Sequence, residues 1–166
     1  MYRLMKVAGL VMDPQTNTPI VILNDPDGDD HLPIWIGLLE ATSIATELEK
    51  IKFPRPMTHD LVKNLLDHLQ VQVEKIEVCD LKENTYYALI YLRTELGVSP
   101  IDSRPSDAIA IALRTNAPIY VKEDVLKRSQ KVAEKETHPV FRQEDKENLE
   151  ELLEKLDPED FGKYKM

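Results

Sequence analysis

The sequence predicts an α+β fold, in which a mixed or mostly antiparallel sheet built from hairpins packs against three or four helices. Three observations support this class. Runs rich in β-branched and aromatic residues are joined by short polar turns, as in hairpins. Segments with helical spacing interrupt these runs irregularly, unlike the regular alternation of a parallel α/β protein. The chain has 166 residues, of which 42% are hydrophobic and 31% charged, so it can bury the core of one globular domain.

The N-terminal part predicts three strands. Residues 3–12 and 18–24 form the first hairpin, because 13–17 between them carries turn formers at both ends. Residues 31–36 form a third strand, in which Trp35 is expected to belong to the core. Pro33 within it has no backbone N–H to donate, so we expect this strand at a sheet edge or at a strand entry.

Two helices should follow. Residues 38–50 carry apolar side chains at helical spacing, and Phe53–Pro56 interrupts the pattern. Thr58 is a good N-cap for the next helix. We expect that helix to bury four leucines, namely Leu61, Leu65, Leu66 and Leu69.

The second half predicts another hairpin and a buried helix. Residues 71–79 are strand-like with a change of phase, which a bulge near 74–75 would correct. Residues 85–92 are apolar at both parities, as expected of a central strand. The remaining predicted elements are a buried helix at 105–115, a short strand at 119–121 and a short helix that begins at 122–124.

The composition changes near residue 130, which predicts a domain over 1–130 and an acidic, helical C-terminal tail over 131–166. In the tail, a leucine stripe on a charged helix at 144–156 should dock on the body or on a partner chain. The net charge of −9 counts against avid, nonspecific nucleic-acid binding, although a local basic groove stays open.

The expected compartment is the cytoplasm. The single cysteine, Cys79, cannot form an internal disulfide, and we interpret it as a buried strand residue. The N-terminus has no apolar segment typical of a signal peptide. No run approaches the roughly 18 to 20 apolar residues of a membrane span, so no membrane partner is expected.

One polar segment precedes the buried helix and is the first candidate site. Arg104 and free helix N–H groups can bind an anion such as a phosphate, with Ser106 beside them. Asp102 and Asp107 can hold a hard divalent cation such as Mg²⁺ or Mn²⁺. The alternative is structural, because capping and the helix dipole explain the same residues. Arg104 could also be held in an ion pair with Asp107 or Glu40, with no ligand bound.

A second candidate lies at the preceding helix N-terminus. His59 is the histidine we would choose as general base, with Asp60 beside it. Arg55 lies between two prolines, which suits a fixed anion contact. Glu40 is an acid in an otherwise apolar first turn, and it could instead pair with Arg104 or Arg55.

Three segments together resemble the bifunctional nuclease family. They are LPIWIGLLEA at 32–41, RPMTHDL at 55–61 and DSRPSDAIAIALR at 102–114, and they occur in the same order. The resemblance covers roughly residues 1–130. It implies an α+β fold that assembles as a homo-oligomer, and a nuclease that acts on DNA and RNA, single-stranded or double-stranded.

The leading hypothesis is therefore a metal-assisted phosphodiesterase. Its catalytic residues would be His59, Asp60, Asp102, Asp107 and Glu40, its substrate-binding residues Arg55, Arg104 and Ser106, and its metal ligands Asp102 and Asp107.

Two alternatives remain open. One is a non-catalytic module that binds a small anion or a protein. The other is a buried structural network, in which Arg104→Ala would cost about 3 to 5 kcal/mol. The hypotheses diverge on whether His59, Asp60, Arg104 and Asp107 line one solvent-open pocket.

Overall fold

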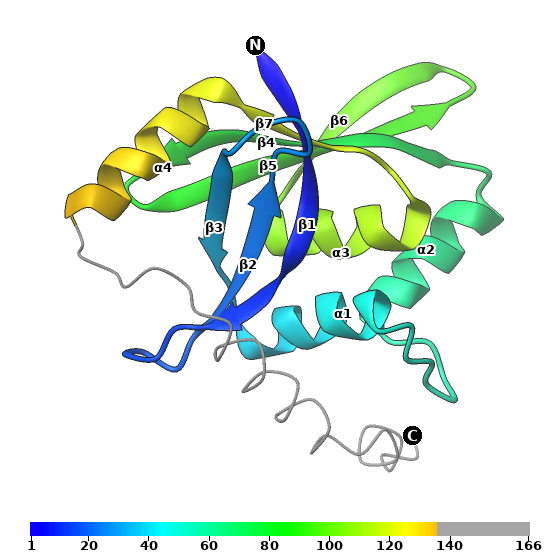
Figure 1. The fold of residues 1–166 in the computed structure, drawn as a ribbon. Coiled ribbons are helices and arrows are strands. Elements are labelled where there is room, and N and C mark those ends of the chain that lie inside the picture. Colours follow the sequence, from blue (N-terminus) through cyan, green and yellow to red (C-terminus); the bar gives the residue numbers. More distant parts are fainter. Residues whose placement is uncertain (136–166) are drawn as a thin grey trace.

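The computed structural model describes residues 1–135, which form one seven-stranded sheet and four helices (Figure 1). The strands are β1 (Tyr2–Met12), β2 (Pro19–Asn24), β3 (His31–Trp35), β4 (Gln72–Lys82), β5 (Thr85–Thr94), β6 (Gly97–Ser103) and β7 (Ile119–Lys122). The helices are α1 (Leu38–Leu48), α2 (Thr58–His68), α3 (Pro105–Thr115) and α4 (Glu123–Lys135).

The sheet order is β3-β2-β1-β7-β4-β5-β6, and its neighbours are antiparallel except for β4 and β7. The predicted α+β class and the predicted hairpins are thus confirmed. β3 lies at an edge, as Pro33 predicted, and the pairing of β4 with β5 slips between Val73 and Lys75, where the bulge was expected.

β1 joins the two parts of the sheet. Its first residues pair with β7, and from Lys6 onward it pairs with β2. A register shift between Val7 and Gly9 lies near the changeover. Because a bulge increases local twist, β1 can leave one part of the sheet and enter the other, and the β1–β3 strands cross the direction of β4–β6 in Figure 1.

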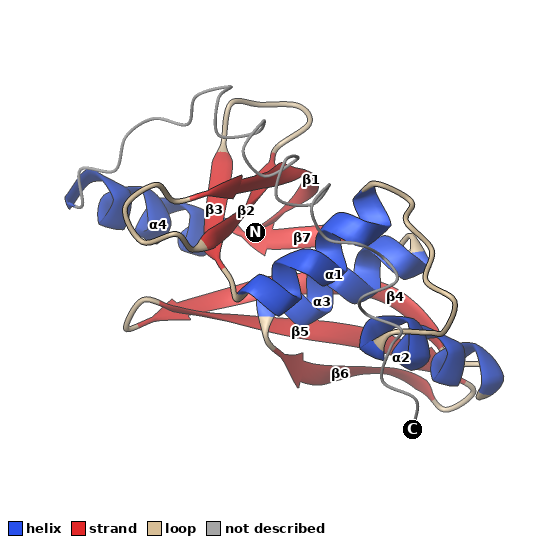
Figure 2. Ribbon diagram, turned by 90° about the horizontal axis from the view of Figure 1, so that it is seen from below, coloured by secondary structure: helices blue, strands red, loops and turns tan. Residues whose placement is uncertain are grey.

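The helices α1 and α3 build the core beneath this bent sheet (Figure 2). α3 packs on β4 and β5, and α1 packs on α3 and on β1 and β2. The almost continuous apolar sequence of α3 is explained by burial, since Ala108 to Ala112 are all buried. Its polar N-terminal end is therefore held rigidly. None of the described helices is long and apolar enough to cross a bilayer.

The prediction that helix α2 buries its leucines is wrong for three of them. The helix has no buried residue, and Leu61, Leu65 and Leu69 are 50%, 52% and 66% exposed. The leucine pattern identifies an apolar face, but α2 packs mainly on α3, through its other side. The first helical residue is Thr58, and Met57 is the N-cap: its N–H donates to the Asp60 carboxylate.

Three further expectations differ from the structure. β6 was not predicted as a strand, because its residues are nearly all exposed and Pro100 interrupts the pattern. Trp35 was expected in the core, yet it is 38% exposed at the edge of the sheet, with its indole N–H on Asp13. Cys79 lies in β4 as expected but is only partly buried.

Helix α4 is longer than the sequence predicted. Residues 131–135, assigned to the tail, continue this helix. Tyr86 on β5 ties α4 to the sheet, since its hydroxyl bonds Ser129 and donates to the Pro33 carbonyl. The rest of the predicted tail, including the helix at 144–156, lies outside the described residues.

Candidate functional site

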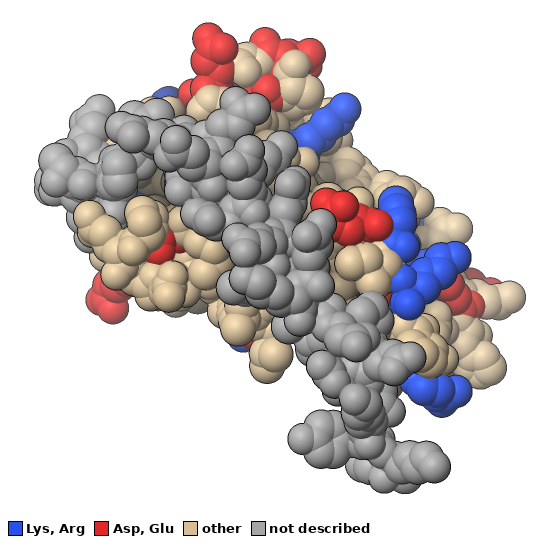
Figure 3. All heavy atoms as spheres, turned by 60° about the horizontal axis from the view of Figure 1, so that its bottom comes forward, with Lys and Arg blue, Asp and Glu red and all other residues tan. Residues whose placement is uncertain are grey.

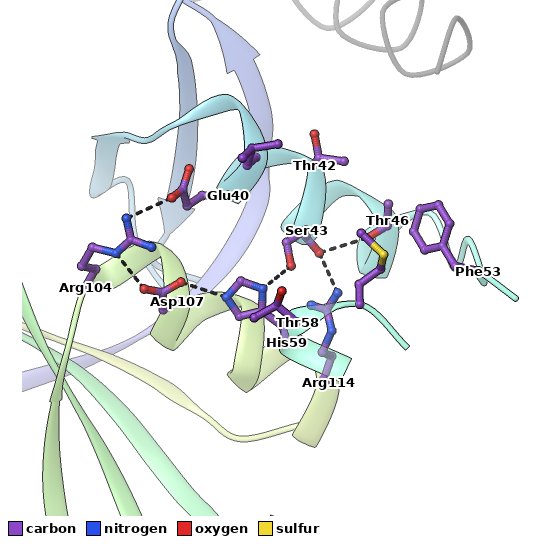
Figure 4. Close-up of a pocket in the computed structure, with 12 residues that line it drawn as sticks. Glu40, Thr42, Ser43, Thr46, Phe53, Thr58, His59, Arg104, Asp107 and Arg114 are labelled. Atoms are coloured by element: carbon purple, nitrogen blue, oxygen red, sulfur yellow. Dashed lines mark hydrogen bonds and ion pairs between the residues drawn. The ribbon is translucent and has the colours of Figure 1, made fainter. Parts of the chain in front are cut away.

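A pocket of about 330 Å³ opens where α1, α2 and α3 meet (Figure 4). Its apolar lining residues are Leu39, Phe53 and Met57. The polar side carries side chains from all three helices. These are Glu40, Thr42, Ser43 and Thr46 of α1, Thr58 and His59 of α2, and Arg104, Asp107 and Arg114 at or within α3.

His59 is the centre of the polar side. Its Nε2 lies 2.8 Å from Asp107 Oδ1, and its Nδ1 lies 2.6 Å from Ser43 Oγ. Because an ionised carboxylate only accepts hydrogen bonds, Nε2 carries the hydrogen. In the neutral ring Nδ1 is then the acceptor, and the Ser43 hydroxyl donates to it. The ring is therefore fixed in one tautomer and one orientation.

Asp107 stays ionised because His59 and Arg104 both donate hydrogen bonds to its carboxylate. Burial raises its pKa, but the hydrogen bonds from Arg104 and His59 outweigh burial, so the pKa of Asp107 lies below the ordinary value for aspartate. Arg104 Nε donates to Asp107 Oδ2 at 2.7 Å. Arg104 Nη1 donates to Glu40 Oε1 at 2.9 Å, so Arg104 links α1 to the start of α3.

The ion pair that the sequence suggested for Arg104 thus forms with both candidates, yet it is not buried. The Arg104 side chain is 65% exposed, and that of Glu40 is 21% exposed. Gly37 makes this arrangement possible, because a Cβ at that position would overlap the Glu40 carboxylate.

Arg114 closes the other end of the pocket and is almost completely buried. Its Nε donates to Asp60 Oδ1 at 2.7 Å, and its Nη2 donates to the Ser43 carbonyl at 3.0 Å. Its Nη1 donates to the Ala110 carbonyl. Burial raises the pKa of Asp60, but the bonds from Arg114 and the Met57 N–H outweigh it and leave that pKa below its ordinary value.

The structure brings together most of the predicted site residues. Glu40, His59, Arg104 and Asp107 line the same pocket, and Asp60 contacts it through Arg114. They come from segments far apart in the chain, since the bonded pair Glu40 and Arg104 is separated by 64 positions.

Besides Asp60, three further predicted residues do not line this pocket. Arg55 is exposed in the α1–α2 loop, and Asp102 is exposed on β6, opposite Leu89 of β5. Ser106 is 6% exposed and faces a separate hollow of about 260 Å³, which Glu40 and Arg104 also line.

The predicted metal pair does not fit a divalent cation in this arrangement. Both oxygens of Asp107 already accept hydrogen bonds from Arg104 and His59, and Asp102 lies outside the pocket. Within residues 1–135, no three His, Cys, Asp or Glu side chains are grouped so that they could hold a metal ion. We therefore derive no step through a metal, and the Mg²⁺ or Mn²⁺ requirement stays a prediction.

Two residues of the site were not singled out from the sequence. Ser43 is a polar residue inside an amphipathic helix, and nothing local distinguishes it from an ordinary solvent-facing serine. Arg114 ends the apolar segment of α3, where a basic residue is common because it favours the helix dipole. A charged side chain at the end of an otherwise buried helix was the only available signal.

Fold and site together define an α+β domain with a histidine-centred polar pocket, a type of site found in hydrolases. Comparison with known proteins gives the family. Residues 21–134 match the bifunctional nuclease domain, and the chain belongs to that family.

An uncharacterized protein of Mycobacterium tuberculosis is 37% identical over 160 residues, which cover 94% of this chain and 96% of the relative. Bifunctional nuclease 1 of Oryza sativa subsp. indica is 29% identical over 109 residues, 63% of this chain and 33% of that protein. Bifunctional nuclease 1 of Arabidopsis thaliana is 28% identical over 109 residues, 63% of this chain and 34% of that protein. The matched segment is thus about a third of each plant protein.

Proposed function

We propose that this protein is a nuclease that hydrolyses phosphodiester bonds of DNA or RNA in the pocket between α1, α2 and α3. The observation that carries the proposal is the His59 ring. Asp107 accepts the hydrogen bond from Nε2–H, so the unprotonated Nδ1 can accept a proton from the Ser43 hydroxyl inside the pocket. A positioned imidazole that accepts a proton from the attacking oxygen is a recurrent device of hydrolases. The plant relatives named bifunctional nucleases support phosphodiesters as the substrate.

The pocket has complementary parts for a nucleotide. Leu39, Phe53 and Met57 give the pocket apolar lining that a base can contact, as protein surfaces that bind unpaired bases do. Arg104 is 65% exposed at the polar side and uses Nε and Nη1 for its ion pairs. Its Nη2 has no hydrogen-bond partner among the described residues, so it can donate to a phosphate oxygen.

Charge argues for a short, local contact with nucleic acid. The chain carries a net charge of −9, and in Figure 3 the visible basic side chains gather on one side of the molecule, some of them next to acidic ones. An extended duplex would need many phosphate contacts. We therefore propose that an unpaired nucleotide enters the pocket, and that affinity depends on salt less steeply than for a protein with a long basic groove.

The test compares two histidines of the same helix. The purified wild type, His59→Asn and His68→Asn are assayed on fluorescent single-stranded DNA and RNA. His68 is exposed at the last turn of α2, so it is the matched control. We expect His59→Asn to reduce cleavage about 100-fold or more, and His68→Asn to leave it unchanged. Equal cleavage by all three proteins would rule out this pocket as the source of activity.

A second candidate is a non-catalytic module that binds a small anion or a protein at the same pocket. Its support is that the carboxylates and guanidinium groups of the pocket already neutralise one another. It predicts that the wild type binds a short oligonucleotide or inorganic phosphate without cleaving any substrate. A calorimetric titration beside the cleavage assay separates the two functions.

The metal requirement is tested in the same assay. Cleavage is measured with Mg²⁺, with Mn²⁺ and with EDTA. The sequence-based hypothesis expects loss of activity in EDTA, whereas the arrangement of Asp107 between Arg104 and His59 supports activity that persists without added metal.

We also propose that the protein forms a homo-oligomer in the cytoplasm, as the sequence suggested. The exposed leucines of α2 support self-association, because a row of uncovered leucines favours a protein contact. The single cysteine is compatible with a reducing compartment. Light scattering of Leu65→Glu should give a smaller species than the wild type. Asn64→Glu, its exposed neighbour on α2, adds the same charge and should not. A wild type that is monomeric at all concentrations would contradict the proposal.

A further inference from the structure

We propose that Ser43 is the nucleophile of this site and forms a covalent phosphoester with the substrate, an inference that rests on the proposed function. No local sequence pattern distinguishes Ser43, and only its position in the folded chain indicates a role. Its hydroxyl lies in the pocket, 2.6 Å from the His59 nitrogen that is free to accept a proton.

The orientation of Ser43 is unusual for a serine inside a helix. A hydroxyl in this position commonly bonds the carbonyl one turn back. The adjacent Thr42 does so, with its Oγ1 on the Leu38 carbonyl at 2.9 Å. Within the described part of the chain, the Ser43 hydroxyl bonds only the imidazole. It is therefore directed at a base.

The backbone of Ser43 is held as firmly as its side chain. Its carbonyl accepts hydrogen bonds from Arg114 Nη2 at 3.0 Å and from Thr46 Oγ1 at 3.1 Å. Arg114 is itself fixed to Asp60 at the start of α2, which also carries His59. One buried guanidinium thus sets the spacing of the serine and the histidine. A nucleophile, a base and a carboxylate that orients the base are the three parts of an activated serine.

The chemical step uses only these groups and the substrate. Ser43 Oγ attacks phosphorus, and its proton passes to His59 Nδ1. The resulting imidazolium is stabilised by the Asp107 carboxylate. The bond from phosphorus to the departing sugar oxygen breaks, and that oxygen takes the proton from Nδ1.

A second, equivalent step releases the enzyme. Water attacks the phosphorus of the Ser43 phosphodiester and gives its proton to Nδ1. The bond between phosphorus and Ser43 Oγ breaks, and the serine regains the proton. Arg104 is the cation best placed to stabilise charge on the phosphoryl oxygens, because it lines the same pocket and has an unused Nη2.

The test is the covalent adduct itself. A fluorophosphonate carries a tetrahedral phosphorus and a fluoride that leaves when a serine oxygen attacks. Wild type, Ser43→Ala, His59→Asn and Ser99→Ala are treated with it, and the adduct is measured by intact mass and peptide mapping. Ser99 is exposed on β6 and is the control serine. We expect one adduct, on Ser43, in the wild type and in Ser99→Ala, and none in the other two variants.

A nuclease assay of the same proteins separates the possible failures. Ser43→Ala should lower oligonucleotide cleavage about 1,000-fold or more. If the wild type cleaves nucleic acid, but Ser43→Ala keeps more than a tenth of that rate and Ser43 takes no adduct, water is the nucleophile. The covalent step is then wrong and the proposed function stands. If Ser43 takes the adduct but no nucleic acid is cleaved, the serine is reactive as inferred and the proposed function is wrong.

Discussion

Replacing Arg114 with alanine should destabilise the protein far more than replacing Arg104, although both arginines make ion pairs in the same pocket. Arg114 has a side chain only 4% exposed and donates to Asp60 and to the carbonyls of Ser43 and Ala110. Arg104 has a side chain 65% exposed and pairs with Glu40 and Asp107 at the rim.

The magnitudes follow from burial. Breaking a buried ion pair costs about 3 to 5 kcal/mol, since the remaining charge is left without its partner. Asp60 is 34% exposed and keeps the Met57 N–H, which places Arg114→Ala near the lower end, at about 3 kcal/mol. For a chain of this size that lowers the melting temperature by about 6 to 12 °C.

Arg104→Ala loses two partly exposed ion pairs, which together contribute about 1 kcal/mol. This revises the sequence-based estimate for a buried Arg104. Urea and thermal unfolding, followed by circular dichroism, measure both variants against the wild type. A loss below about 1 kcal/mol for Arg114→Ala, or a larger loss for Arg104→Ala than for Arg114→Ala, would refute the reasoning.

Two further predictions concern the carboxylates that these arginines contact. The pKa values of Asp60 and Asp107 are lower in the folded protein than the unfolded value of about 3.9, so their ionised forms stabilise the fold above that pH. That contribution to stability is lost as the pH falls through the lowered folded-state pKa. The difference in urea midpoint between wild type and Asp60→Asn should therefore be largest near pH 7 and shrink below about pH 4. A difference that stays constant down to pH 3 would exclude Asp60 as the source. Gly37→Ala should push the Glu40 carboxylate away from Arg104, so its cleavage rate and stability should match those of Glu40→Gln. A Gly37→Ala protein with an intact Glu40–Arg104 pair in a crystal structure would contradict this.

The hairpins were predictable because their signals are local. Turn formers at 13–17, the proline of β3 and the change of phase in β4 each act on residues next to them in the chain. β6 was missed for the same reason: its residues are exposed on both faces, so it carries no alternation of apolar and polar side chains.

The apolar face of α2 shows a different limit. Helical spacing of leucines identifies which side is apolar, but it does not say what covers that side. Leu61, Leu65 and Leu69 were expected in the core, and in the structure they lie uncovered on the chain's surface.

Some residues of the site could be identified from the local sequence, and others could not. Acids at helix N-termini follow a local rule, so Asp60 and Asp107 could be selected from the sequence, and His59 because it lies next to Asp60. Their meeting depends on how α1, α2 and α3 pack, and His59 bonds residues 16 and 48 positions away. Ser43 enters the site only through that packing, so no local pattern could identify it.

The measurement that tests the account most directly is a double-mutant cycle on cleavage of a single-stranded oligonucleotide. The value of kcat/KM is compared for wild type, Ser43→Ala, His59→Asn and the double variant. If Ser43 and His59 act as one unit, Ser43→Ala loses about 1,000-fold or more, His59→Asn loses about 100-fold or more, and the double variant loses no more than the worse single one. Losses that multiply, or a double variant that still cleaves like the wild type, would contradict the account.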